Sequence, residues 1–104
     1  MSQKAVAVVG AGAAGLASAI RLANQGLNVH LFEKNGYTGG KMTVYEQDGF
    51  RFDAGPSLFN LTQLVDDLFK LCGKNPRDYF NYKRHHTACR YYWPNGKSVT
   101  LTSD

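Results

Sequence analysis

Residues 5–15 read Ala5-Val6-Ala7-Val8-Val9-Gly10-Ala11-Gly12-Ala13-Ala14-Gly15, and they decide the fold of this 104-residue chain. The first five residues form an uninterrupted apolar run, which is typical of a buried parallel strand. Three glycines follow with the spacing G-x-G-x-x-G. Apolar residues then recur at helical spacing from Leu16 onward, and Gly26 is placed to end a helix in the left-handed conformation. The sequence therefore predicts a strand, a tight glycine turn and a helix.

A second strand follows this helix directly. Residues 27–32 alternate apolar with polar side chains and lead to Glu33. Strand, glycine turn, helix and strand form a βαβ unit, which we predict over residues 1–34 as the start of a Rossmann-like α/β fold. Two parallel strands cannot stand alone, because both faces and both edges of a parallel sheet must be covered. We therefore predict an incomplete domain.

The glycine spacing has a chemical purpose in proteins that bind dinucleotides. Gly10 permits the turn out of the strand, Gly12 lets the backbone approach a pyrophosphate, and Gly15 lets the helix pack closely on the strand. The first turn of the helix, with Ala13 and Ala14, presents N–H groups and a positive dipole end to the phosphates. The alternative is a glycine-rich turn in an ordinary βαβ unit.

Glu33 supports the dinucleotide interpretation. It comes 18 residues after Gly15, at the end of the second strand, where a carboxylate can accept hydrogen bonds from an adenosine ribose. The same negative charge would repel a 2′-phosphate, so NADP is disfavoured as the ligand.

The rest of the chain predicts one helix, two antiparallel hairpins and two loops. The second helix has an apolar stripe that ends at Cys72, and Gly73 stops it. An Asp-Gly pair marks the first hairpin turn, and Pro94-Asn95-Gly96 marks the second. The predicted segments are a loop at 36–41, strands at 43–46 and 50–53, a break at 55–57, a helix over 61–72, and strands at 87–93 and 98–102.

Composition narrows the functional classes. The chain is 43% hydrophobic and 12% aromatic, which excludes a disordered segment, and its length excludes a two-domain enzyme with its own substrate chamber. Two cysteines are too few for a disulfide scaffold, and no stretch has the character of a targeting or membrane-spanning segment. A reduced, cytoplasmic compartment is therefore expected.

Several segments resemble a known family of flavoproteins. Glu33-Lys34 and Gly39-Gly40-Lys41 resemble the acid and glycine doublet of the FAD-dependent amine-oxidase-like superfamily, in which Arg usually stands where this chain has Lys41. Residues 48–57 are more specific and are similar to the bacterial-type phytoene desaturases and their relatives that act on carotenoids. Residues 63–69 and 73–79 continue the likeness, which covers nearly the whole chain.

The resemblance implies an FAD-binding N-terminal portion of an oxidoreductase that removes hydride and proton from a carotenoid precursor, either phytoene or a later carotenoid. It implies that the glycine doublet lies by the pyrophosphate and ribityl chain, and that the 55–57 segment lies near the flavin. The portion itself should be inactive, and no catalytic residue is assigned. The expected cofactor-binding residues are Gly10, Gly12, Ala13, Ala14, Gly15, Glu33, Lys34, Gly39, Gly40, Lys41, Gly55, Pro56 and Ser57.

Two other function classes stay open. One is another flavin oxidoreductase of the same superfamily, such as an amine or protoporphyrinogen oxidase. The other is a dinucleotide-binding module without chemistry. A metal centre is not expected: His85 and His86, placed on a strand, would point to opposite faces.

The second half of the chain is basic and aromatic. Residues 74–97 hold six Lys or Arg residues against one Asp, interleaved with Tyr, Phe and Trp. This pattern fits an ordinary half-buried hairpin on one face of a larger protein, which we favour, or a surface for an anionic partner. A polyene substrate favours peripheral contact with the inner face of a membrane over nucleic acid. Exposed sheet edges also predict self-association of the fragment.

Overall fold

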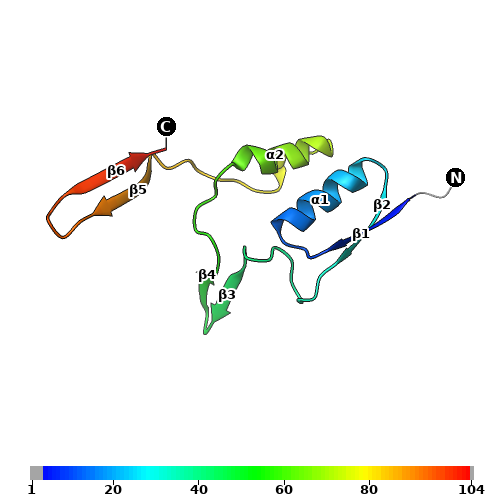
Figure 1. Cartoon of the computed structure of the whole chain (residues 1–104), viewed down its shortest axis with the longest axis horizontal. Coiled ribbons are helices and arrows are strands. Elements are labelled where there is room, and N and C mark those ends of the chain that lie inside the picture. Colours follow the sequence, from blue (N-terminus) through cyan, green and yellow to red (C-terminus); the bar gives the residue numbers. More distant parts are fainter. Residues whose placement is uncertain (1–3, 104) are drawn as a thin grey trace.

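The βαβ unit forms as predicted. In the computed structural model, which describes residues 4–103, β1 (Ala5–Val9) pairs in parallel with β2 (Asn28–Phe32), and α1 (Ala13–Asn24) packs against both strands. The register runs from Ala5 opposite Asn28 to Val9 opposite Phe32. Figure 1 shows this unit at one end of the molecule, with α1 along the two strands. The Rossmann-like α/β class is confirmed.

Gly26 ends α1 in the way that the sequence predicts. Its φ is +83°, and its N–H donates to Ala23 O at 2.9 Å. The next N–H, from Leu27, reaches back to Leu22 O at 3.3 Å. These two bonds form a Schellman ending, which turns the chain directly into β2.

The two antiparallel hairpins also form. The first joins β3 (Val44–Gln47) to β4 (Phe50–Asp53), so its first strand begins one residue later than predicted. Its turn holds Asp48 at φ +51° and Gly49 at φ +82°, the pair of positive values that a two-residue turn of type I′ requires. The second hairpin joins β5 (Thr87–Tyr92) to β6 (Ser98–Thr102).

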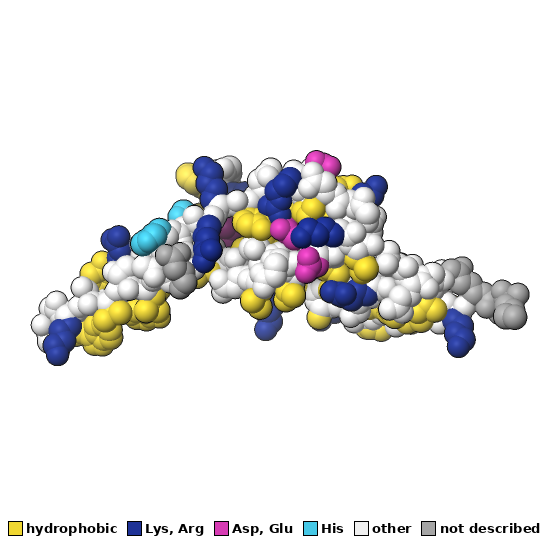
Figure 2. Space-filling view, turned by 90° about the horizontal axis from the view of Figure 1, so that it is seen from above, with side chains coloured by type: hydrophobic (Ala, Val, Ile, Leu, Met, Phe, Trp, Pro, Cys, Tyr) yellow, Lys and Arg dark blue, Asp and Glu magenta, His cyan; other side chains and the backbone are white. Residues whose placement is uncertain are grey.

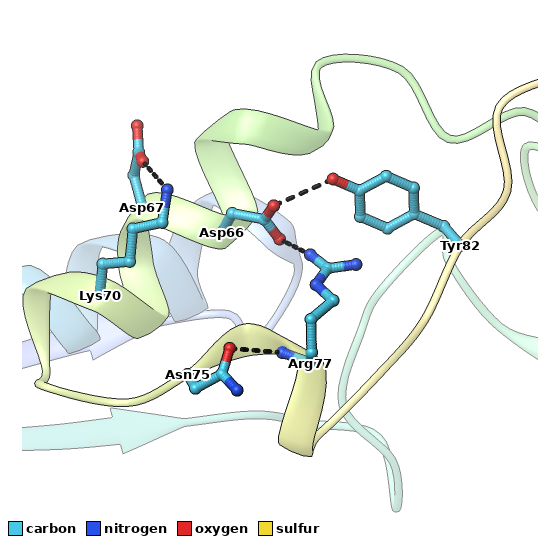
Figure 3. A network of polar contacts seen from close by, with 6 residues as sticks. All are labelled: Asp66, Asp67, Lys70, Asn75, Arg77 and Tyr82. Atoms are coloured by element: carbon cyan, nitrogen blue, oxygen red, sulfur yellow. Dashed lines mark hydrogen bonds and ion pairs between the residues drawn. The ribbon is translucent and has the colours of Figure 1, made fainter.

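The second helix, α2 (Thr62–Leu71), lies against α1, and the short 3₁₀ helix η1 (Pro76–Asp78) packs on it. A polar network fixes this corner (Figure 3). Arg77 forms an ion pair with Asp66, which also accepts a hydrogen bond from the Tyr82 hydroxyl at 2.9 Å. The guanidinium carbon of Arg77 lies 4.3 Å from the Tyr82 ring centroid and 5.0 Å from that of Phe80.

The predicted aromatic and basic surface separates into two groups. Tyr79 and Phe80 stack on Phe69 of α2, with ring centroids 4.9 and 5.6 Å apart. Tyr91 pairs with Trp93 on the β5–β6 hairpin, where Figure 2 shows hydrophobic side chains along one edge. In the described part of the chain, β5 and β6 contact each other and no other helix or strand. A hairpin half-buried on one face of a larger protein therefore stays a prediction.

Burial is the point on which the sequence-based expectations fail most clearly. Among residues 4–103 only Ala11 and Pro76 are buried, and Val9 of the expected buried strand is 86% exposed. Cys72, on the apolar stripe of α2, is exposed as well. The radius of gyration is 18.6 Å, against about 13 Å for a compact chain of this length. The apolar faces that a Rossmann-like sheet presents to other layers are uncovered, so the domain is incomplete, as predicted.

Neither α1 nor α2, the two α-helices in residues 4–103, combines the length and apolar character needed to cross a bilayer.

Candidate dinucleotide-binding site

The glycine turn continues the sheet before it enters the helix. Gly10, at φ +96°, donates its N–H to Phe32 O at 2.7 Å, one step beyond the β1–β2 ladder. A Cβ on Gly15 would lie 1.8 Å from Gly10 O and 3.8 Å from Val8 Cγ1. The start of α1 therefore lies directly against the turn, and only glycine fits at this contact.

Ala11 is the centre of the site. Its N–H donates to Glu33 Oε2 at 2.7 Å, and its carbonyl accepts the N–H of Gly39 at 2.7 Å. One buried residue thus joins the glycine turn to the acid that follows β2 and to the glycine doublet. Sequence reasoning passed over Ala11 because its contribution comes entirely from backbone atoms, which no side-chain pattern reports.

Glu33 is held by donors on both carboxylate oxygens. Oε1 accepts the backbone N–H and the Nδ2–H of Asn35, each at 2.9 Å, while Oε2 accepts from Ala11. The Asn35 N–H, and after it the Ala11 N–H, lower the pKa of Glu33 below its ordinary value, against a smaller opposing effect of desolvation. The side chain is therefore a fixed negative charge that accepts hydrogen bonds and cannot donate them.

The glycine doublet lies on the glycine turn. Gly12 and Gly39 form a parallel bridge, and a Cβ on Gly40 would lie 3.0 Å from Gly12 Cα. Gly39 has φ +103°, and a Cβ there would lie 2.8 Å from Met42 O. This close approach of two backbones explains why both members of the doublet are glycine.

The first hairpin brings a third segment to the doublet. Ala54 donates its N–H to Thr43 O at 2.9 Å, and a Cβ on Gly55 would lie only 1.9 Å from Lys41 O. Gly55 thus packs on the backbone that follows the doublet. Pro56 and Ser57 continue from it with exposed side chains.

The open side of the site is the first turn of α1. Gly12 is the N-cap residue and has no side chain to cap the helix, while Ala13 and Ala14 are exposed. A Cβ on Gly12 would meet nothing closer than Gly40 Cα at 3.9 Å, so the fold leaves room there. Lys34 and Lys41 are also exposed, and no ion pair within residues 4–103 involves either of them.

The structure therefore joins the predicted segments in sequence. The 10–15 turn contacts the Glu33 carboxylate and the backbone of the 39–41 segment, and Gly55 lies against Lys41 O at the end of that segment. His85 and His86 lie before β5 and not on a strand, because pairing begins at Thr87. Across the described residues, no three His, Cys, Asp or Glu side chains gather as a metal ion would require.

A known protein family matches the part of the chain that forms this site. Residues 8–74 match the NAD(P)-binding Rossmann-like domain family, a span that includes the glycine turn, Glu33, the doublet and α2. The chain belongs to this family.

The relatives of this Rossmann-like domain include enzymes of carotenoid metabolism. The chain is 46% identical over 101 residues to a 1-hydroxycarotenoid 3,4-desaturase of Flavobacterium sp. (strain P99-3). The matched region covers 97% of this chain and 20% of the relative. The chain is 39% identical over 99 residues to a 4,4'-diapophytoene desaturase of Staphylococcus aureus (strain MRSA252), covering 95% and 20%. A 4,4'-diaponeurosporene oxygenase of Staphylococcus haemolyticus (strain JCSC1435) is 38% identical over 104 residues, covering 100% and 21%.

A solved structure of wild-type putrescine oxidase bound to putrescine superimposes with a TM-score of 0.60 at 29% identity, over 99% of this chain and 22% of that one. The chain thus spans about a fifth of the length of the curated relatives and of the structure that it matches. The resemblance to carotenoid desaturases and to the amine-oxidase-like superfamily is confirmed.

Proposed function

We propose that this chain is the N-terminal FAD-binding portion of an oxidoreductase that desaturates a carotenoid precursor. The observation that carries the proposal is the pair of hydrogen bonds made by the backbone of Ala11, which join the Glu33 carboxylate and the glycine doublet to the same glycine turn. In this proposal residues 1–34 are the dinucleotide-binding unit, and residues 35–104 add the doublet loop, the second helix and the hairpins.

The geometry suits the ADP half of a dinucleotide. The space at Gly12, which a Cβ would fill, lies at the uncapped N-terminus of α1, where N–H groups and the helix dipole favour a pyrophosphate. Glu33, held at the end of β2, would accept a hydroxyl of the adenosine ribose. Its fixed negative charge disfavours a 2′-phosphate, which argues against NADP.

The doublet and the 55–57 segment favour FAD over NAD. They pack on the glycine turn and on the segment after the doublet, and the family resemblance implies that the ribityl chain and the flavin bind beside them. We propose Gly39, Gly40 and Lys41 beside the pyrophosphate and ribityl chain, and Gly55, Pro56 and Ser57 near the flavin. Lys41 would contribute a single compact charge there, without the planar fork of the usual Arg.

FAD, when bound, supplies the oxidant that accepts hydride from the isoprenoid. The residues of this chain bind and orient the cofactor: backbone N–H groups of the turn hold the phosphates and Glu33 fixes the ribose. The close packing of Gly15, Gly40 and Gly55 on neighbouring backbone keeps this frame rigid. The carotenoid class of the substrate rests on the names of the relatives, which are desaturases of 1-hydroxycarotenoid and of 4,4'-diapophytoene.

The test is expression of the complete reading frame that contains residues 1–104 in a host that accumulates phytoene. Desaturation lengthens the conjugated polyene, so the pigment absorbance should move from the ultraviolet into the visible. The same frame carrying Gly12→Ala should leave phytoene unchanged. Unchanged pigment with the wild-type frame, in hosts that supply phytoene and in hosts that supply a hydroxycarotenoid, would refute the proposed substrate class.

An amine oxidase is the second candidate, and the likeness to putrescine oxidase favours it. The purified full-length flavoprotein separates the two candidates. Bleaching of the flavin spectrum by putrescine under anaerobic conditions supports an amine oxidase, and bleaching by phytoene in detergent supports a desaturase. A protein that binds FAD and is bleached by neither substrate would favour a non-catalytic binding module.

We further propose a cytoplasmic location with peripheral contact of the β5–β6 hairpin at the inner membrane face. The paired residues Tyr91–Val99 and Cys89–Leu101 form an apolar face of this hairpin, which also carries Arg90 and Lys97. Trp93 is the only tryptophan in the chain, so its emission reports on this face alone. A blue shift with anionic vesicles supports the contact, and no shift with either anionic or neutral vesicles contradicts it.

Self-association of the 104-residue chain is the last part of the proposal. The hairpins leave strand edges free and most large apolar side chains exposed. Sedimentation that depends on concentration would support it, and a single monomeric species across a hundredfold range of concentration would exclude it.

A further inference from the structure

The loop between β4 and α2 is apolar and exposed. It follows the 55–57 segment directly and presents three large apolar side chains to solvent: Leu58 is 61% exposed, Phe59 46% and Leu61 63%. Figure 1 shows this loop as the connection that runs from β4 to the start of α2. The dinucleotide site as described does not use these side chains.

Leu61 has a backbone conformation that a leucine rarely adopts. Its φ is +53° and its ψ is +42°, in the left-handed region, where a bulky side chain is strained. Its carbonyl accepts the N–H of Leu64 at 3.0 Å, so α2 begins from this strained residue. Residues held in such conformations cluster at active sites and at sites that clamp ligands. Glycine adopts this conformation without strain, which indicates that the leucine side chain itself is needed here.

Phe59 fixes the loop to the corner that α2 and η1 form. Its ring lies edge-on to the rings of Phe80 and Tyr82, with centroids 6.1 and 5.8 Å away. The Arg77 guanidinium lies over both of those rings, and Figure 3 shows its ion pair with α2. The loop is therefore positioned by contacts within this chain, and its exposed leucines precede and follow the anchored ring.

The chemistry of the loop selects its occupant. Residues 54–65 contain no Asp, Glu, Lys, Arg or His. The carboxylates that flank this stretch, on Asp53 and Asp66, each form an ion pair, with Arg51 and Arg77 respectively. An exposed leucine surface without charges of its own favours an uncharged hydrocarbon over an amine or a nucleotide.

We propose that residues 58–61 form one wall of the substrate site, on which Leu58 and Leu61 contact the hydrocarbon chain of an isoprenoid. The wall continues without a break from the 55–57 segment, which the proposed function places near the flavin, so a substrate on this wall would lie beside the oxidant. The inference rests on that proposed function. It goes beyond it by assigning substrate contacts to residues of this chain.

The first test uses the FAD-loaded protein expressed from the complete reading frame. Titration with phytoene in detergent, under anaerobic conditions, gives the rate of flavin bleaching at saturation and the concentration for half-maximal rate. Leu58→Ser should raise that concentration about tenfold and leave the rate at saturation unchanged, because the side chain binds the substrate and takes no part in the chemistry. Leu71→Ser, at an exposed leucine at the other end of α2, is the matched control and should behave as wild type. A half-maximal concentration that is the same in Leu58→Ser and in Leu71→Ser overturns the inference.

Leu61→Gly separates a substrate contact from a packing contact. Glycine relieves the left-handed strain, so this variant should unfold at the same temperature as wild type or at a higher one. It should nevertheless need about tenfold more phytoene for half-maximal bleaching. A lower unfolding temperature would assign Leu61 to packing against the remainder of the protein, and that result, like an unchanged half-maximal concentration, would overturn its role in the wall.

Squalane separates this inference from the proposed function, because a saturated isoprenoid hydrocarbon occupies an apolar wall without reducing a flavin. Gel filtration of the full-length protein with radiolabelled squalane in detergent measures its binding without reference to FAD. Wild type that phytoene does not bleach refutes the proposed desaturation, and squalane then decides on the wall alone. Retention of squalane that Leu58→Ser weakens about tenfold supports the wall. Equal retention by both proteins, or no retention by wild type, overturns it.

Discussion

Gly15→Ala is the substitution whose cost the structure predicts most directly. The new Cβ would lie 1.8 Å from Gly10 O, a backbone atom that cannot rotate away. Turn and helix must separate by at least about 1 Å, and overpacking of this kind costs about 1–3 kcal/mol or more. Alanine recovers up to about 1 kcal/mol through its better helix propensity. We therefore expect a net loss of about 2 kcal/mol in the free energy of unfolding.

The assay is thermal and urea unfolding of the chain, followed by circular dichroism. A loss of 2 kcal/mol lowers the midpoint temperature of a domain of this size by about 10 °C. Gly36→Ala is the matched control, because nothing lies within 4 Å of its Cβ and its φ is not in the left-handed region. It should be neutral or slightly stabilising. If Gly15→Ala proves as stable as Gly36→Ala, the inferred contact between α1 and the turn is wrong.

Three further predictions concern the site and its frame. Gly12→Ala should change the free energy of unfolding by less than about 1 kcal/mol, since its Cβ meets nothing closer than 3.9 Å. It should nevertheless abolish retention of dinucleotide on a desalting column. Retained dinucleotide would contradict the role of Gly12 in binding. Glu33→Gln should make the free energy of unfolding fall less steeply as the pH is lowered into the acid range. Because the pKa of Glu33 is lowered in the folded chain, its carboxylate stabilises the fold fully above the ordinary pKa of 4.5. That stabilisation is lost as the pH falls through the lower folded pKa. An acid limb identical in wild type and Glu33→Gln would refute that. Arg77→Lys keeps the charge near Asp66 but loses the stacking on Phe80 and Tyr82. It should lower the free energy of unfolding, measured in urea, by about 1 kcal/mol. An unchanged free energy of unfolding would mean that the stacking of Arg77 does not stabilise the contact between α2 and η1.

The sequence predicts local structure in this chain well because the decisive signals are local. The G-x-G-x-x-G spacing, Gly26 and the Asp48-Gly49 pair each require a backbone conformation that the structure then shows. Parallel pairing of β1 and β2 follows from the βαβ order, since a helical crossover joins strands that run in the same direction.

Burial could not be predicted in the same way. A run such as residues 5–9 reports how apolar a strand is, whereas its burial depends on layers that pack on it from elsewhere, and Val9 remains 86% exposed. The contacts of Ala11 and Asn35 with Glu33 could not be predicted from the sequence either. Both residues act through backbone or amide groups, whose partners are set by tertiary geometry. The doublet was recognised by resemblance, and the structure supplies its physical reason in the close approach of Gly40 to Gly12.

The most direct test of the central claim is the visible spectrum of the purified chain after incubation with FAD and desalting, beside samples treated with NAD and beside the Gly12→Ala variant. If residues 1–104 hold the FAD site, wild type retains a flavin spectrum that Gly12→Ala lacks. Retention of NAD in place of flavin, or equal flavin in both proteins, would contradict it.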